Sequence, residues 1–121
     1  MRDARKLIDA IEKWMSQIIS ASGAGGAVVG LSGGIDSAVA AALLKEALGT
    51  ERVITVYMPC HSIPLDGEHA RLTAEALGVR MLTVDLSETF DVCRRTIDRV
   101  MEPSTLAAAN IKPRLRMITA Y

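Results

Sequence analysis

The chain has 121 residues, which is enough for one domain of ordinary size and too few for two. Half of the residues are hydrophobic and 23% are charged, so the composition supports a packed core and excludes a disordered chain. The formal net charge of zero argues against a general binder of nucleic acids or of membrane surfaces.

Positive charge is concentrated towards the C-terminus. Residues 91–121 hold six of the 14 basic side chains but three of the 14 acidic ones, which suits an anionic small molecule better than a duplex. No apolar stretch approaches the length of a membrane span, and the N-terminal residues contain no apolar signal-peptide core. Cys60 and Cys93 lack metal-ligand spacing, which predicts reduced thiols in a cytoplasmic protein.

The first half of the chain alternates between helical and extended patterns. Apolar residues at helical spacing predict an amphipathic helix over 3–20, and a Ser/Gly-rich break follows at 20–26. The short apolar run 27–32 predicts a buried strand. Helical spacing returns over 36–48, and Gly49 is expected to close that helix.

The second half continues this alternation. The β-branched run 53–58 predicts a second strand, and Asp66 is expected to cap a helix that ends at Gly78. Further expected elements are a strand at 81–85, a helix capped by Ser87 that carries Phe90, Cys93, Ile97 and Val100, and a last helical segment after Pro103. Strands that alternate with helices predict an α/β fold, with a parallel sheet and helices on both faces. Ligands bind such sheets at the carboxyl ends of the strands.

The segment S-G-G-I-D-S joins the first predicted strand to the second predicted helix. Its glycines let the backbone bend tightly and bring N–H groups close to a ligand. The following helix adds unpaired N–H donors and a partial positive charge, and serine hydroxyls donate readily to phosphate oxygens. The segment therefore predicts a loop that binds ATP or pyrophosphate, made of Gly30, Leu31, Ser32, Gly33, Gly34, Ile35, Asp36 and Ser37.

Two familiar phosphate loops are excluded by their residues. Neither 30–35 nor 23–30 gives the G-x-G-x-x-G of a dinucleotide-binding turn, and 23–30 precedes the strand instead of following it. A Walker A loop needs G-K-[ST], but no lysine lies between Lys13 and Lys45. Hydride transfer and P-loop phosphoryl transfer are therefore poor interpretations.

Asp36 is the unexpected residue of this loop, because a carboxylate repels a polyphosphate unless a cation lies between them. Mg²⁺ takes one or two carboxylates together with phosphate oxygens, so Asp36 is predicted to be a Mg²⁺ ligand. The alternative is a helix N-cap, a role that Asp often fills. Its place in S-G-G-I-D-S after a strand favours the metal ligand.

The strand and loop, V-V-G-L followed by S-G-G-I-D-S, resemble the signature of the N-type ATP pyrophosphatases. That family has a Rossmann-like parallel sheet of the adenine nucleotide alpha hydrolase type and splits ATP into AMP and pyrophosphate. Two further stretches resemble its ammonia-dependent NAD synthetases. They are residues 57–79, where M-P follows a strand and L-G ends a helix, and residues 110–117, N-I-K-P-R-L-R-M. The resemblance covers nearly the whole chain.

The resemblance implies an enzyme that amidates deamido-NAD to NAD. ATP would activate the nicotinate carboxylate as an adenylate with release of pyrophosphate, and ammonia would then displace AMP. The loop would stabilise the leaving pyrophosphate, and Mg²⁺ on Asp36 would serve as Lewis acid and template. Arg114 is implied to contact deamido-NAD, the alternative being a solvated helix charge. A homodimer is implied too, with free ammonia as nitrogen source unless a separate glutaminase subunit supplies it.

Pro113 stands where many members of the family carry alanine. Proline costs about 3 kcal/mol in a helix interior but is favourable in the first turn. The last helix is therefore expected to start near residues 112–113, which places Arg114 and Arg116 close to its N-terminus. Solvent-exposed loop positions are expected for His61 and His69. Cys60 also lies in this region, and nothing around it indicates a nucleophile.

The resemblance also implies a further segment after residue 117, with a G-T-x-N-x-x-E stretch whose Glu is a second Mg²⁺ ligand. No such stretch occurs here. Residues 1–121 are therefore expected to form a single ATP-pyrophosphatase domain that is incomplete at its C-terminus, the N-terminal half of such an enzyme. Two alternatives stay open: a non-catalytic, nucleotide-binding half-domain that needs another polypeptide, and a pyrophosphatase-loop ligase that acts on a different carboxylate.

Overall fold

The computed structural model describes residues 3–101 and 108–121. Its helices and strands are, in chain order, α1 (Ala4–Ser22), β1 (Ala27–Leu31), α2 (Ile35–Leu48), the 3₁₀ helix η1 (Thr50–Arg52), β2 (Val53–Tyr57), α3 (Pro64–Leu77), β3 (Arg80–Thr83), α4 (Ser87–Asp98) and α6 (Ile111–Ala120). The predicted alternation is confirmed, with small shifts at the ends of elements. The predicted beginning of the last helical segment, just after Pro103, lies outside the described residues.

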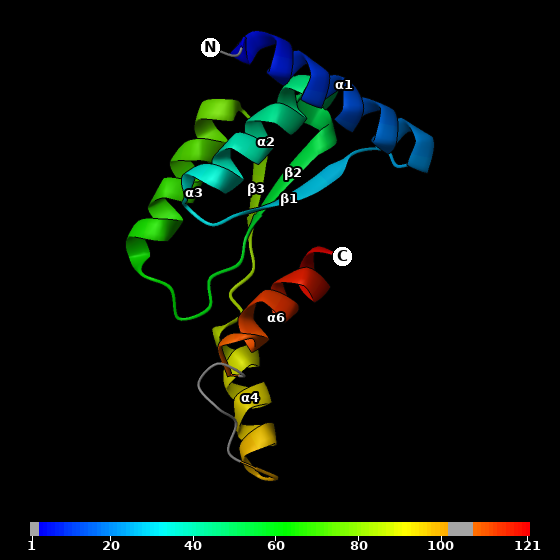
Figure 1. The fold of residues 1–121 in the computed structure, drawn as a ribbon. Helices are drawn as coiled ribbons and strands as arrows, with labels where there is room; N and C mark the ends of the chain where they lie inside the picture. The colour runs from blue at the N-terminus through cyan, green and yellow to red at the C-terminus, as the bar shows by residue number, and fades with distance from the viewer. Residues whose placement is uncertain (1–2, 102–107) are drawn as a thin grey trace.

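The three strands form one parallel sheet in the order β1-β2-β3 (Figure 1). Its register pairs Leu31 with Tyr57, and Tyr57 in turn with Thr83. Parallel neighbours need a crossover, which α2 supplies between β1 and β2 and α3 between β2 and β3. The carboxyl ends of all three strands therefore meet at the same edge of the sheet, and the predicted α/β class is confirmed.

One face of the sheet packs against α2 and α3. The buried cluster on this face consists of Leu31, Ala41, Leu48, Val53, Ala70, Ala74 and Val79. Ala41 of α2 and Ala70 of α3 are completely buried, so these small side chains let both helices lie close to the strands. Helix α1 packs along α2, and Ile19 reaches from it towards the cluster (Figure 1).

The opposite face is covered only at the carboxyl ends of the strands, beyond which α4 and α6 lie (Figure 1), and a second buried cluster joins them to the sheet. Its buried residues are Val56, Met58, Cys60 and Leu86, and Phe90 of α4 and Leu115 of α6 pack against them. Val28 of β1 is 50% exposed, so the cover is partial. No helix of the described ranges 3–101 and 108–121 has the length and apolar character needed to cross a membrane.

The predicted cap of α3 is wrong. The helix begins at Pro64 with Ile63 as its N-cap, so Asp66 lies inside the first turn. Proline suits the first helical position because its missing N–H would have no partner there and its φ is already helical. The other end of α3 follows the prediction, since Gly78 closes the helix with a φ of 70°.

The predicted cap of α4 is wrong as well. Leu86 is the N-cap and Ser87 is the first helical residue, whose Oγ accepts a hydrogen bond from the backbone N–H of His61 at 2.9 Å. Asp85 instead accepts the Ser87 N–H at 2.9 Å, and this bond lowers the pKa of the Asp85 carboxyl. The helix ends at Asp98, so Val100, 86% exposed, lies beyond it.

We expect Ala70→Leu to lower the free energy of unfolding by about 1–3 kcal/mol, because the larger side chain enters a completely buried position. Ala76→Leu on the same helix is the matched control, since Ala76 is exposed and should change stability by less than about 0.5 kcal/mol. Urea unfolding followed by circular dichroism measures both. Equal stabilities of the two variants would show that α3 does not pack on the sheet as described.

Candidate functional site

A tight turn carries the chain from β1 into α2. Gly33 has a φ of +86°, and Gly34 is the N-cap of α2 with a φ of −92°. A Cβ on Gly33 would lie 2.6 Å from the backbone oxygen of Asp66, in the first turn of α3. Both the positive φ and this close approach require glycine, so the loop is packed directly on the backbone of α3.

Serine hydroxyls tie the two ends of the loop together. Ser37 Oγ accepts the Ser32 N–H at 3.1 Å and lies 3.1 Å from Ser32 Oγ. Ser32 Oγ in turn accepts the Gly34 N–H at 3.3 Å. The first helical bond of α2 runs from the Ala38 N–H to the Gly34 carbonyl, so the N–H groups of residues 35–37 have no carbonyl partner within the helix. These donors and hydroxyls together suit an anion.

Asp36 is the second residue of α2 and is exposed. The alternative interpretation of Asp36 as the N-cap is wrong, because Gly34 holds that position without a side-chain hydrogen bond. In the described ranges, no group of three or more His, Cys, Asp or Glu side chains is placed to hold a metal ion alone. One exposed carboxylate fits a Mg²⁺ ion that shares its remaining ligands with phosphate and water.

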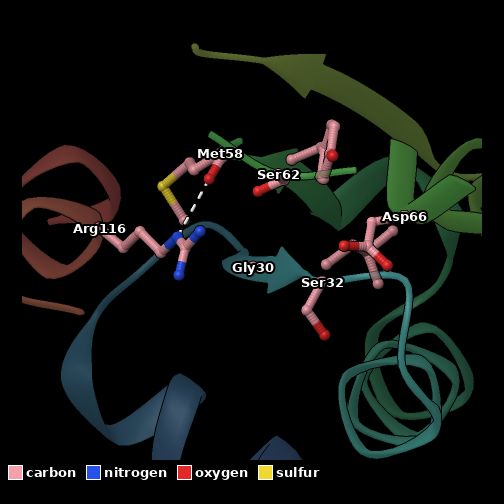
Figure 2. A pocket seen from close by; sticks show the side chains of 8 residues that line it. Gly30, Ser32, Met58, Ser62, Asp66 and Arg116 are labelled. Carbon is pink, nitrogen blue, oxygen red and sulfur yellow. Dashed lines mark hydrogen bonds between the residues drawn. The ribbon is translucent and has the colours of Figure 1, made fainter. Parts of the chain in front are cut away.

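A cavity of about 430 Å³ opens where β1 and β2 end (Figure 2). It is lined by Gly30, Leu31, Ser32, Tyr57, Met58, Ser62, Asp66 and Arg116. Ser32 and Asp66 lie on one side of it in Figure 2, and Met58 and Arg116 lie on the other. The wall beside Tyr57 is close-packed, because a Cβ on Gly67 of α3 would lie 3.0 Å from the Tyr57 ring.

The two arginines of the C-terminal motif lie in different places. Arg116 Nε donates to the Met58 carbonyl at 3.0 Å, which fixes the side chain at the cavity. Arg114 is exposed, and its Nη1 lies 3.4 Å from both the carbonyl and the Oδ1 of Asn110. Arg114 borders a separate hollow with Cys93 between α4 and α6. Residues two apart on a helix face different directions. Of the two arginines, Arg116 is therefore the one that reaches the cavity lined by Ser32 of the loop.

The two histidines are exposed, whereas Cys60 is buried. The predicted exposure of His61 and His69 is confirmed, but the predicted loop position of His69 is wrong, because it lies inside α3. His61 Nε2 lies 2.8 Å from Asp91 Oδ1 on α4. Cys60 is 1% exposed, and burial raises the pKa of its thiol. A buried thiol with a raised pKa stays protonated, so it is a poor nucleophile. Both cysteines, Cys60 and Cys93, are free.

Sequence reasoning found the loop but missed five residues of the cavity: Tyr57, Met58, Ser62, Asp66 and Arg116. A usable signal was present for two of them. Met58 and Ser62 follow the second strand, and residues after neighbouring parallel strands share one edge of the sheet. The last helix offered no comparable signal. The motif at 110–117 contains both Arg114 and Arg116, and its sequence does not indicate which of the two faces the sheet.

Comparison with known proteins relates this site to one family. A sequence model described as NAD synthase matches residues 7–121. The NH(3)-dependent NAD(+) synthetase of Finegoldia magna is 44% identical over 116 residues, which is 96% of this chain and 47% of that protein. The chain thus spans about half the length of the curated relatives it matches. The chain belongs to the NAD synthase family.

Solved structures agree with this placement. The NH3-dependent NAD synthetase from Campylobacter jejuni, in complex with the nitrate ion, matches with a TM-score of 0.88 and 27% identity over 99% of this chain and 51% of its own. The glutamine-dependent NAD+ synthetase from Acinetobacter baumannii, in complex with ADP, matches with a TM-score of 0.91 and 25% identity. That match covers 99% of this chain and 23% of the larger protein. The Rossmann-like form of the parallel sheet is therefore shared with NAD synthetases.

We expect Gly33→Ala to destabilise the protein by about 1–2 kcal/mol or more, because alanine disfavours a φ of +86° and its Cβ meets the Asp66 carbonyl. Gly34→Ala is the matched control: its φ is negative, and its Cβ would lie 3.4 Å from Ser32 Oγ, an ordinary contact. Chemical unfolding of both variants gives the difference. A Gly34→Ala variant as unstable as Gly33→Ala would contradict the described turn.

Proposed function

We propose that this chain is the ATP-binding part of an ammonia-dependent NAD synthetase, which converts deamido-NAD to NAD. ATP activates the nicotinate carboxylate as an adenylate with release of pyrophosphate, and ammonia then displaces AMP. The observation that carries the proposal is the 32–37 loop, which follows the carboxyl end of β1 and combines a glycine turn, two serine hydroxyls and the unpaired N–H groups of a helix start. The 44% identity to a protein named NH(3)-dependent NAD(+) synthetase supports the substrate assignment.

The loop would act on the leaving pyrophosphate. Negative charge grows on that group as its bond to the α-phosphorus breaks, and fixed N–H and O–H donors stabilise such charge. Loss of one donor in comparable sites costs about 3 kcal/mol of transition-state stabilisation. Ser32 and Ser37 hold each other in place through their hydrogen bond, and Ser37 Oγ also donates to the Gly34 carbonyl at 3.3 Å. Their oxygens are therefore already positioned, and the hydroxyl hydrogens would turn from these partners to the phosphate when the ligand binds.

Asp36 would hold Mg²⁺ against the phosphates. The ion, when bound, supplies positive charge and orients the pyrophosphate. The cavity beyond Ser32 would take the nucleoside end of ATP, and the ADP in the related Acinetobacter baumannii structure supports a nucleotide in this fold.

The remaining assignments concern deamido-NAD and assembly. Arg114 would contact an anionic group of deamido-NAD, and its exposed place on α6 is compatible with binding near a subunit interface. A homodimer is part of the proposal, supported by three large apolar side chains on α1 that are about half exposed, Leu7, Trp14 and Ile18. A cytoplasmic location is proposed too, in keeping with the free thiols of Cys60 and Cys93.

A second candidate is a non-catalytic, nucleotide-binding half that needs another polypeptide. The observation in its favour is that Asp36 is the one carboxylate of the 32–37 loop, and within the described ranges no group of three or more His, Cys, Asp or Glu side chains could hold a metal ion. A pyrophosphatase-loop ligase for a different carboxylate is less well supported, because it does not account for the motif at 110–117.

The first test is to incubate the chain with deamido-NAD, Mg-ATP and ammonium, and to measure ATP binding, NAD and AMP together. Tight Mg-ATP binding with equimolar NAD and AMP is expected from the proposal. Mg-ATP binding without either product, in a folded chain, identifies the second candidate. A folded chain that binds no ATP contradicts both.

The Mg²⁺ assignment is tested by Asp36→Ala. We expect the Mg²⁺-dependent gain in ATP affinity, about tenfold or more, to disappear while the fold is retained, because the exposed carboxylate makes no structural hydrogen bond among the described residues. Calorimetric titration with and without EDTA measures this gain. Glu46→Ala, at the far end of α2, is the control and should behave like the parent chain. An unchanged Mg²⁺ dependence in Asp36→Ala would remove Asp36 as a ligand.

A further inference from the structure

The ends of β1 and β2 diverge beside the cavity. Their ladder ends with the pair Leu31 and Tyr57, after which the turn at Gly33 leads β1 away. The carbonyls of Tyr57 and Pro59 accept hydrogen bonds from Val84 and Leu86 on the β3 side. Because carbonyl directions alternate along an extended chain, the Met58 carbonyl between them points to the β1 side, where no strand is left to pair with it.

Arg116 occupies this gap. Its Nε donates to the Met58 carbonyl at 3.0 Å, so the guanidinium takes the place of a missing strand neighbour (Figure 2). A guanidinium has five N–H donors, and this contact uses one of them. Within residues 3–101 and 108–121, the two terminal nitrogens of Arg116 make no hydrogen bond or ion pair. Four oriented donors therefore remain at the cavity.

The surroundings of these donors suit an anion. Ser32 of the loop and Ser62 offer hydroxyls in the same cavity, and Ser32 lies across it from Arg116 in Figure 2. Asp66 is the acidic residue of the lining, and no ion pair joins its carboxylate to Arg116 in the described ranges. The positive charge is thus held in place by Met58 without being neutralised.

We propose that Arg116 binds the α-phosphate of ATP and of the adenylate made from it. This inference rests on the proposed function, in which the 32–37 loop takes the two outer phosphates and the cavity takes the nucleoside. The phosphate that joins those two ends then lies over the end of β1, opposite Arg116. A planar guanidinium donates to two oxygens of one phosphate at once, which a lysine does not do.

The same contact would assist the reaction. A carboxylate oxygen of deamido-NAD forms a bond to the α-phosphorus, and the bond from that phosphorus to the bridging oxygen breaks, with the electron pair leaving on pyrophosphate. In the transition state, the oxygens that stay on the α-phosphorus gain negative charge, and the terminal nitrogens of Arg116 stabilise this charge. Arg114, two residues away on α6, would meet the other substrate, so α6 borders both reactants.

Two ligands separate this role from that of the loop: AMP carries only the α-phosphate, whereas Mg-pyrophosphate carries only the outer ones. We expect Arg116→Gln to weaken AMP binding about tenfold or more and Mg-pyrophosphate binding less than about threefold, as measured by calorimetry. Ser37→Ala should show the reverse pattern. Arg95→Gln, the same charge change at an exposed position of α4, should leave both affinities unchanged.

Equal weakening of both ligands in Arg116→Gln, or unchanged AMP affinity, overturns the inference. Arg116→Lys tests it again in case the glutamine variant disturbs the fold. Lysine keeps the positive charge but has no planar group that donates to two oxygens of one phosphate. This variant should bind AMP more tightly than Arg116→Gln and less tightly than the parent chain, and equal affinities for all three overturn the proposal. A parent chain that binds neither AMP nor ATP is the separate failure of the proposed function.

Discussion

The contact of Gly33 with the backbone of Asp66 is the constraint on which the rest of the site depends. The chain leaves β1 through a positive φ at Gly33, and the loop lies directly on the first turn of α3. Helix α2 then starts at the carboxyl edge of the sheet, close to Ser32, which lines the cavity. The same turn removes β1 from the side of Met58, and this leaves the space that Arg116 fills.

Much of this architecture follows from local patterns in the chain. The alternation of apolar runs and helical spacing predicts the parallel sheet, because strands of one direction need crossovers and the crossovers here are helical. The start of α6 close to Pro113 and the end of α3 at Gly78 follow from backbone preferences of single residues. The phosphate loop is visible for the same reason, since its glycines and serines are consecutive.

What could not be predicted depends on contacts between distant parts of the chain. Ser87 looks like a cap, but its hydroxyl is engaged by the backbone of His61, 26 residues earlier. Arg114 and Arg116 belong to one short motif, and only the packing of α6 on the sheet determines that Arg116 reaches the cavity. Asp66 is a good cap by type, yet Pro64 starts the helix before it. Tertiary packing thus decided the roles of Ser87 and Arg116, whereas the start of α3 was decided locally by Pro64.

The narrow contact between Gly67 and Tyr57 has an evolutionary consequence. Glycine inside a helix costs about 0.5–1 kcal/mol relative to alanine, so selection for stability alone would replace Gly67. The Tyr57 ring opposes that change, because an added Cβ would lie 3.0 Å from it and the ring would have to move by a few tenths of an ångström. A methyl group at position 67 becomes acceptable once position 57 carries a smaller side chain. Substitutions at positions 57 and 67 should therefore occur together among related sequences. The cavity wall beside position 57 should then change its shape only when both residues change.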